Sequence, residues 1–237
     1  PEKSDLTIRY LLTMTSGLQW DDESTSYYDP SNDMYKLFTD PDPMRFVLSK
    51  DLLKTPGTCF EYRNCNTNVI GEIIHRATGT RLDLFCDSLL FSKLGIVTYE
   101  WQRIAPEIIF TSGDLMLRPR DMAKFGQLFL KKGRWNGEQL ISEEWCTEST
   151  SEHIDPNDFS ASYTWCDGYG YQWWQKDYTY DKKVFHTYFA LGWGGQQITM
   201  IHELETVIVL TGGNWYTSEK ISCHNLIEDY IIPALPD

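Results

Sequence analysis

The stretch VFHTYFALGWGGQQITMIHELETVIVLT, residues 184–211, decides the fold class. Its apolar and aromatic residues gather in short runs, at 184–190, 197–201 and 206–211, with short turn segments between them. A similar run covers 169–175. This spacing predicts strands joined by tight turns, and therefore an antiparallel sheet.

Outside this stretch the pattern is mainly helical. An amphipathic segment at 218–232, followed by Pro233, predicts a last helix lying on the strands. Upstream, helices are expected at about 4–13, 43–50, 80–90 and 119–132, at a short segment near Trp145, and at a longer one that Asn64 or Asn66 caps and Gly79 ends. We therefore predict an α+β fold, organised as one domain over 1–237 with a mainly helical part (1–166) and a part of strands plus the terminal helix (167–237).

Composition narrows the class of partner. The 237 residues carry a formal net charge of −13, which disfavours nucleic acid and anionic membrane surfaces, since both require basic patches. No apolar run is long enough to span a bilayer. Aromatic residues make up 14% of the chain, which fits either a large aromatic core or an aromatic-lined pocket for a small molecule. The compartment stays open.

No metal or cofactor is predicted. The 6 cysteines include no Cys-x-x-Cys pair, and the 5 histidines show no zinc-ligand spacing. Neither a phosphate loop nor a dinucleotide fingerprint is present. The cysteines are expected to be free, partly buried thiols.

The segment 19–43 is rich in Asp, Ser, Tyr and Pro and predicts a long irregular loop. Loops of this length in compact domains are usually functional or mobile. We expect it to act as a lid, with Trp20, Tyr27 and Tyr28 as substrate-binding residues; a plain surface loop is the alternative.

Tyr62-Arg63-Asn64 precedes a predicted helix. A phenol at a helix start and near a lysine can lose its proton more easily, because both features stabilise phenolate. Tyr62 could then accept a proton from a serine hydroxyl, and the amide of Asn64 could orient a substrate or a lysine. A packed aromatic residue is the simpler interpretation of Tyr62.

The run Leu191-Gly192-Trp193-Gly194-Gly195-Gln196 holds three glycines in four positions. Glycines within a strand often mark the close approach of a ligand or another backbone, although a tight turn would also use them. Gly192 and Gly194 are therefore candidate substrate-binding residues, and the backbone N–H of Trp193 could form half of an oxyanion hole.

These motifs resemble the serine β-lactamase and penicillin-binding-protein superfamily. The more specific matches are Leu11-Leu12-Thr13-Met14-Thr15-Ser16-Gly17-Leu18 and Arg118-Pro119-Arg120-Asp121-Met122-Ala123-Lys124-Phe125. Tyr62-Arg63-Asn64 resembles the family's Tyr-x-Asn motif, and Leu191 to Gln196 its third motif. The chain is most similar to the class C-like esterases and 6-aminohexanoate-oligomer hydrolases, and the resemblance spans nearly all of it.

The resemblance implies a serine hydrolase of the β-lactamase/transpeptidase fold that acts on a small amide or ester. No serine here has a lysine three residues later, and the chain begins at Pro1. We therefore expect the Ser-x-x-Lys motif and the first strands upstream, so this chain alone would be inactive and would associate with itself or with the N-terminal segment. Ala190-Leu191 replaces the cation of penicillin-recognising members, which leaves esters and other amides as substrates. A non-catalytic binding module of the same fold is the alternative.

Overall fold

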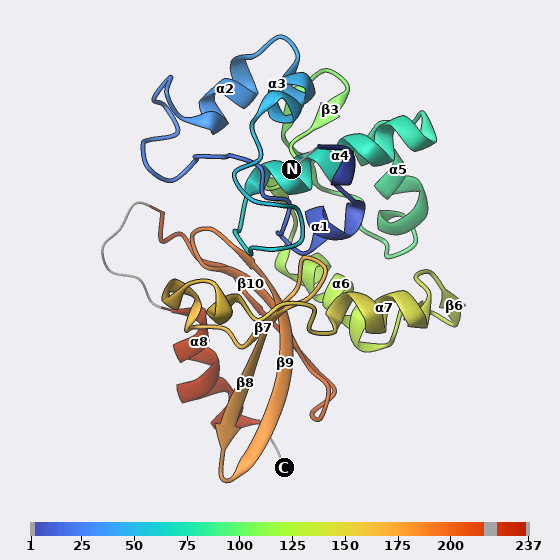
Figure 1. The fold of residues 1–237 in the computed structure, drawn as a ribbon. Coiled ribbons are helices and arrows are strands. Elements are labelled where there is room, and N and C mark those ends of the chain that lie inside the picture. Colours follow the sequence, from blue (N-terminus) through green and yellow to red (C-terminus); the bar gives the residue numbers. More distant parts are fainter. Residues whose placement is uncertain (1–2, 216–221, 236–237) are drawn as a thin grey trace. The chain divides into compact units, whose positions relative to one another are not determined.

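The computed structural model describes residues 3–215 and 222–235. The chain divides into two compact units, Pro1–Met116 and Leu117–Asp237. Figure 1 follows them from blue to red. The single domain over 1–237 stays a prediction, and each unit is described by itself.

The first unit is mainly helical. Its helical segments are η1 (Lys3–Asp5), α1 (Ile8–Leu12), α2 (Asp33–Thr39), α3 (Pro43–Ser49), α4 (Asn64–Thr78), α5 (Leu82–Cys86) and the π-helical turn η2 (Asp87–Phe91). Two small antiparallel ladders pair β1 (Glu100–Trp101) with β4 (Leu115–Met116) and β2 (Arg103–Ala105) with β3 (Ile108–Ile109). The sequence patterns did not predict these ladders, because each strand is only two or three residues long.

Local signals set most of the helix ends in this unit. Asp42 caps α3 by accepting a hydrogen bond from the backbone N–H of Arg45, and Gly79 ends α4 with φ +66°, as predicted. The continuous helix expected at 4–13 is wrong. The chain breaks after η1, and Thr7 caps a separate α1 through the N–H of Tyr10.

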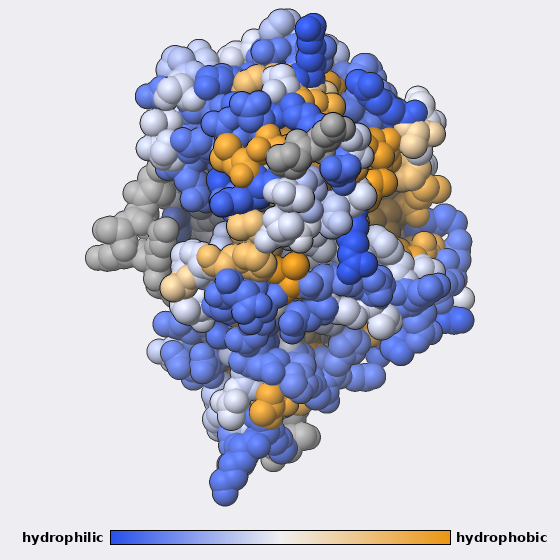
Figure 2. All heavy atoms as spheres, in the orientation of Figure 1, coloured by the Kyte–Doolittle hydropathy of each residue, from blue (hydrophilic) through white to orange (hydrophobic). Residues whose placement is uncertain are grey.

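The core of the first unit packs α1, α2 and α3 around α4. It includes Leu11, Leu37, Val47 and Val69, each at most 8% exposed. Surface helices with one apolar face are stabilised mainly by this kind of packing. Figure 2 shows further orange, hydrophobic side chains at the surface of this unit, among blue polar ones.

The second unit carries the main sheet. Its strands are β7 (Gly168–Tyr169), β8 (Trp174–Tyr180), β9 (Lys183–Gly192), β10 (Gln196–Ile201) and β11 (Thr206–Leu210), in the order β11-β10-β9-β8-β7 and antiparallel throughout. Its helical segments are α6 (Pro119–Leu130), α7 (Glu143–Thr150), η3 (Pro156–Asp158), η4 (Ala161–Tyr163), α8 (Cys223–Leu226), η5 (Ile227–Ile231) and η6 (Ile232–Ala234), and β5 (Arg134–Trp135) pairs with β6 (Glu138–Gln139).

Strand periodicity directs neighbouring side chains to opposite faces of this sheet. Met200 packs in a cluster with Phe129 of α6, whereas Ile201 packs in another with Ile227 of η5. Figure 1 shows α8 beside the long β8–β9 hairpin. The predicted α+β fold, an antiparallel sheet flanked by helices, is therefore confirmed; residues 218–221 of the predicted last helix lie outside the described residues.

One predicted strand is wrong. Residues 169–175 form a hairpin rather than a strand, since Tyr169 of β7 pairs with Trp174 of β8. The N–H of Gly170 bonds to the carbonyl of Trp173, and Gln172 takes φ +67° in the turn. A short run of aromatic residues is compatible with a tight hairpin as well as with a single strand, because either structure can bury these side chains.

Candidate active site

The Tyr62-Arg63-Asn64 motif stands at the N-terminus of α4, the longest helix of the first unit. Tyr62 and Asn64 are both half-buried. The structure corrects the predicted cap: Arg63 is the N-cap, its side chain makes no capping hydrogen bond, and Asn64 is the first helical residue. The amide of Asn64 is therefore available for tertiary contacts.

That amide binds a buried carboxylate. Nδ2 of Asn64 lies 2.6 Å from Oδ2 of Asp22, whose residue is 4% exposed. Hydrogen bonds to an ionised acceptor are roughly twice as strong as neutral ones. The contact joins residues 42 positions apart, so no local pattern predicted it.

Two further asparagines anchor the first turns of α4, and both are 0% exposed. Nδ2 of Asn66 lies 3.3 Å from Sδ of Met14. Asn68 donates to Oγ of Ser112 over 3.0 Å and accepts from the N–H of Thr111 over 2.9 Å. The α4 N-terminus is thus fixed to two separate loops, which makes it a rigid support for Tyr62 and Asn64.

The structure also brings two sequence motifs together. The N–H of Glu61, beside Tyr62, bonds to the carbonyl of Met14 over 2.9 Å. Met14 takes φ +57°, a conformation that is uncommon outside glycine, and its side chain is 1% exposed. The segment 11–18 therefore runs directly beside the Tyr62 motif.

The predicted lid is only partly irregular. Its second half forms α2, whose N-cap Asn32 accepts from the N–H of Met34. The same side chain donates to the carbonyls of Asp22 and Thr25, at 3.3 Å and 2.9 Å, and so closes the base of an exposed loop, 23–31. The expectation of irregular chain across 19–43 is thus wrong for 33–39, because the apolar face of Met34 and Leu37 enters the core.

The three aromatic residues of this segment differ in exposure. Tyr28 is 83% exposed and Tyr27 is 38% exposed, so both stand on the exposed loop. Trp20 is 2% exposed and packs in the core, with its ring centroid 6.0 Å from that of Phe46. Trp20 acts here as a packing residue.

The glycine-rich run forms the turn between β9 and β10 in the second unit. Gly194 and Gly195 take φ +83° and +92°, which glycine adopts without strain. The carbonyl of Gly194 accepts from the N–H of Asn214 over 3.0 Å, and a Cβ at Gly194 would collide with the ring of Trp215. The turn is therefore braced by the segment after β11, while the side chain of Trp193 is 52% exposed.

The cysteines are free thiols, and burial raises the pKa of Cys65 and of Cys166 to about 12 and that of Cys86 to about 11. A neutral thiol is a poor nucleophile.

Within residues 3–215 and 222–235, no group of three or more metal-ligating side chains is close enough to hold an ion. None of the helices described there is long and apolar enough to cross a membrane.

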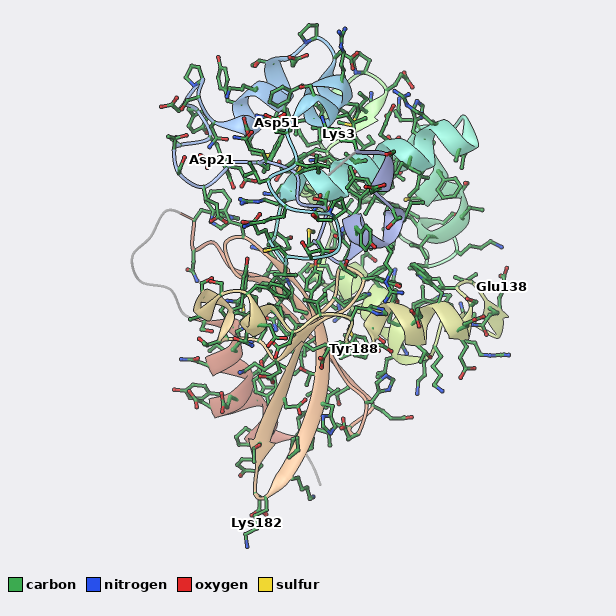
Figure 3. The ribbon with its side chains drawn as sticks, in the orientation of Figure 1. Lys3, Asp21, Asp51, Glu138, Lys182 and Tyr188 are labelled. Atoms are coloured by element: carbon green, nitrogen blue, oxygen red, sulfur yellow. The ribbon has the colours of Figure 1, made fainter. Side chains whose placement is uncertain are left out.

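Two hollows lie apart from the predicted residues. One, of about 340 Å³ in the first unit, is mostly apolar and is lined by Lys3, Leu6, Thr7, Ile8, Leu11, Leu18, Leu48, Val69 and Ile73. The other, of about 330 Å³ in the second unit, is polar and includes Tyr188, which Figure 3 labels. In this hollow, Nδ1 of His186 lies 2.9 Å from Oδ1 of Asp177, so these two side chains pair with each other.

The candidate residues are thus divided between the two units. Tyr62 and Asn64 belong to the first unit, with Tyr27 and Tyr28 on its exposed loop, and Gly192, Trp193 and Gly194 belong to the second. The sequence patterns did not identify Asp22, which stands two residues after Trp20 within the predicted lid. An acidic residue in a loop gives no signal of its own, because its partner is chosen by the tertiary fold.

Comparisons with known proteins agree with this architecture. A family model described as Beta-lactamase matches residues 1–219. Among solved structures, a provisionally assigned 6-aminohexanoate-dimer hydrolase from Bacillus anthracis is 21% identical with a TM-score of 0.76, over 96% of this chain and 60% of that one. A penicillin binding protein from Bacillus halodurans is 16% identical with a TM-score of 0.63, over 88% and 68% of the two chains.

A D-amino acid amidase from Ochrobactrum anthropi is likewise similar. It is 16% identical with a TM-score of 0.61, and the match covers 87% of this chain and 63% of that one. At these identities the likeness concerns the fold. The chain spans about 60% of the length of the Bacillus anthracis protein, so it corresponds to part of that structure.

Proposed function

Because the chain belongs to the beta-lactamase family, we propose that it is the C-terminal part of a serine hydrolase that cleaves amides or esters through an acyl-enzyme. The nucleophilic serine and its lysine stand upstream in the full-length protein. Tyr62 exchanges the proton between the serine and the leaving group, together with the lysine. Asn64 helps to hold this network.

The single observation that carries the proposal is the rigid N-terminus of α4. Tyr62 stands two residues before the helix, where the helix dipole favours negative charge. Asn64 is held over 2.6 Å by Asp22, and Asn68 binds the loop at Thr111 and Ser112. A proton shuttle depends on such fixed geometry, because proton transfer requires hydrogen-bond distances.

The β9–β10 turn supports the second half of the mechanism. A backbone N–H aimed at a developing oxyanion stabilises it best when the backbone is already rigid. The bond from Asn214 to Gly194 and the close packing against Trp215 supply that rigidity beside Trp193. We assign the N–H of Trp193 to the oxyanion hole, with the N–H of the upstream serine as its partner.

The same turn argues for a substrate without a carboxylate at this position. Ala190 and Leu191 precede Gly192, and Ala190 packs against the cluster around Met200 and Phe129. Neither side chain carries a charge, so these two positions offer no ion pair to a penicillin-type carboxylate. Neutral esters and simple amides are the substrates that we propose.

The test replaces Tyr62 by Phe in the full-length protein. Losing a proton shuttle costs about 10²–10⁴-fold in rate, so kcat/KM for a p-nitrophenyl ester should fall by that factor. Circular dichroism and thermal unfolding should stay close to wild type, since only one oxygen atom is lost. Tyr230→Phe also removes one phenol hydroxyl, from a residue that is 70% exposed, and as the matched control it should leave turnover unchanged.

Two outcomes would contradict the proposal. Full activity of the Tyr62→Phe variant would remove Tyr62 from the mechanism. Ester cleavage by the isolated 237-residue chain would show that a nucleophile lies within it. A full-length protein with no Ser-x-x-Lys motif that still binds small amides would instead support the non-catalytic binding module.

A further inference from the structure

Asp22 is a buried carboxylate that touches the proposed machinery. Its residue is 4% exposed, and its Oδ2 lies 2.6 Å from Nδ2 of Asn64. A buried charge is costly unless it is paired or hydrogen-bonded. The bond to Asn64 therefore stabilises Asp22, and it also restricts the amide.

The bond to Asp22 fixes which end of the Asn64 amide faces the carboxylate. Oδ2 of Asp22 accepts from Nδ2 of Asn64, so the carboxylate faces the NH₂ end of the amide. The carbonyl oxygen Oδ1 is then the group that the same amide can offer elsewhere. Asn64 accordingly presents an acceptor, which suits the ammonium of a lysine or the N–H of an amide substrate, since both only donate.

Asp22 also stands at the base of the exposed loop. Its main-chain carbonyl accepts from Nδ2 of Asn32 over 3.3 Å, and Asn32 also holds the carbonyl of Thr25. Next to it, the N–H of Asp21 bonds to Oδ2 of Asp33, which pairs with Lys50 over 2.6 Å. The backbone around Asp22 is thus held by hydrogen bonds from Asn32 and to Asp33, both of which follow the loop 23–31.

We propose that Asp22 is a positioning residue, which holds the Asn64 amide with its carbonyl oxygen available to the reacting groups and couples it to the base of loop 23–31. This inference rests on the proposed function of Asn64. Asp22 itself touches no substrate. It acts by removing the alternative orientation of the amide, in which the NH₂ group would face the reacting groups.

The experiment is a double-mutant cycle in the full-length protein, with hydrolysis of a p-nitrophenyl ester as the readout. The variants are Asp22→Asn, Asn64→Ala and both together, with Asp51→Asn as the control. Asp51 is an exposed carboxylate of the same unit, labelled with Asp21 in Figure 3, and it does not bind Asn64.

Asp22→Asn should lower kcat about 10–100-fold, the size of loss that follows when the hydrogen-bonded partner orienting a metal ligand is removed. KM should change little, because the substrate does not touch residue 22. The double variant should be no slower than Asn64→Ala alone, since Asp22 acts only through that amide. Asp51→Asn should match the wild type.

The possible outcomes separate this inference from the proposed function. If Asn64→Ala is slow and Asp22→Asn is not, the positioning role is wrong and the function of Asn64 stands. A double variant slowed by the product of the two single effects would also overturn the coupling. If neither variant is slow, Asn64 has no role in turnover, whatever Tyr62→Phe shows. Should Asp22→Asn fail to fold, Asp22→Glu keeps the charge but displaces the carboxylate, and the same non-additivity is expected.

Discussion

Acid should destabilise the second unit through one half-buried histidine, His224 of α8. Its Nδ1 lies 2.8 Å from the hydroxyl of Tyr178, and its ring packs against Trp165 and Phe189, with centroids 5.6 Å and 5.0 Å away. Burial lowers the pKa of His224 to about 4. Among neighbouring charges, Lys176 lowers this pKa further and Asp167 opposes the shift.

The sign and size follow from linkage. Well above pH 6.5 the imidazole is neutral in both the folded and the unfolded chain, so His224 does not change the free energy of unfolding there. As the pH falls from 6.5 to about 4, the unfolded chain takes up a proton that the folded chain refuses, and stability is lost. A single site with these values loses about 2 kcal/mol between pH 7 and pH 5. Solvent screens the half-buried ring, so we expect about 1 kcal/mol.

The assay is urea unfolding, followed by circular dichroism at pH 7 and at pH 5, for the wild type and His224→Phe. The free energy of unfolding of the variant should fall by about 1 kcal/mol less over this interval. Tyr178→Phe is the control. It should lose about 1 kcal/mol at both pH values, because it removes one hydrogen bond but not the burial. Equal losses for wild type and His224→Phe would refute the reasoning.

Three further predictions concern packing, the loop and association. Gly126→Val should lower the free energy of unfolding by about 1–3 kcal/mol by overpacking α6 against the sheet, since even a Cβ at Gly126 would lie 2.6 Å from Cγ1 of Val207. A urea midpoint equal to that of the wild type would contradict this. The control is Gln127→Ala, at an exposed position of the same helix. Replacing Tyr27 and Tyr28 together by Phe in the full-length protein should slow ester turnover if their hydroxyls meet the substrate, and unchanged kcat and KM would leave 23–31 as a plain surface loop. In the described part of the sheet β11 is an edge strand, and the unpaired backbone groups of an edge strand can pair with another chain. Analytical ultracentrifugation should therefore find the chain self-associated, or bound to an added N-terminal segment. A monomer that does not bind that segment would contradict this prediction.

Much of the fold could be predicted from the sequence because its signals are local. The antiparallel sheet followed from apolar runs and tight turns at 184–211, and the ends of α3 and α4 followed from Asp42 and Gly79. Predictions failed where one local pattern fits two structures. The aromatic run at 169–175 could be a strand or a hairpin, and the polar lid could hide α2.

The candidate site divides in the same way. Tyr62, Asn64 and the turn at Gly192–Gly194 were named from their motifs, because glycines and a helix start carry information along the chain. The bonds that give these residues a defined geometry join distant positions: Asn64 to Asp22, Asn66 to Met14, and Gly194 to Asn214. An amide or a carboxylate has several partners of equal chemistry within one sequence. Only the tertiary fold, by burying one pair together and away from water, decides which bond forms.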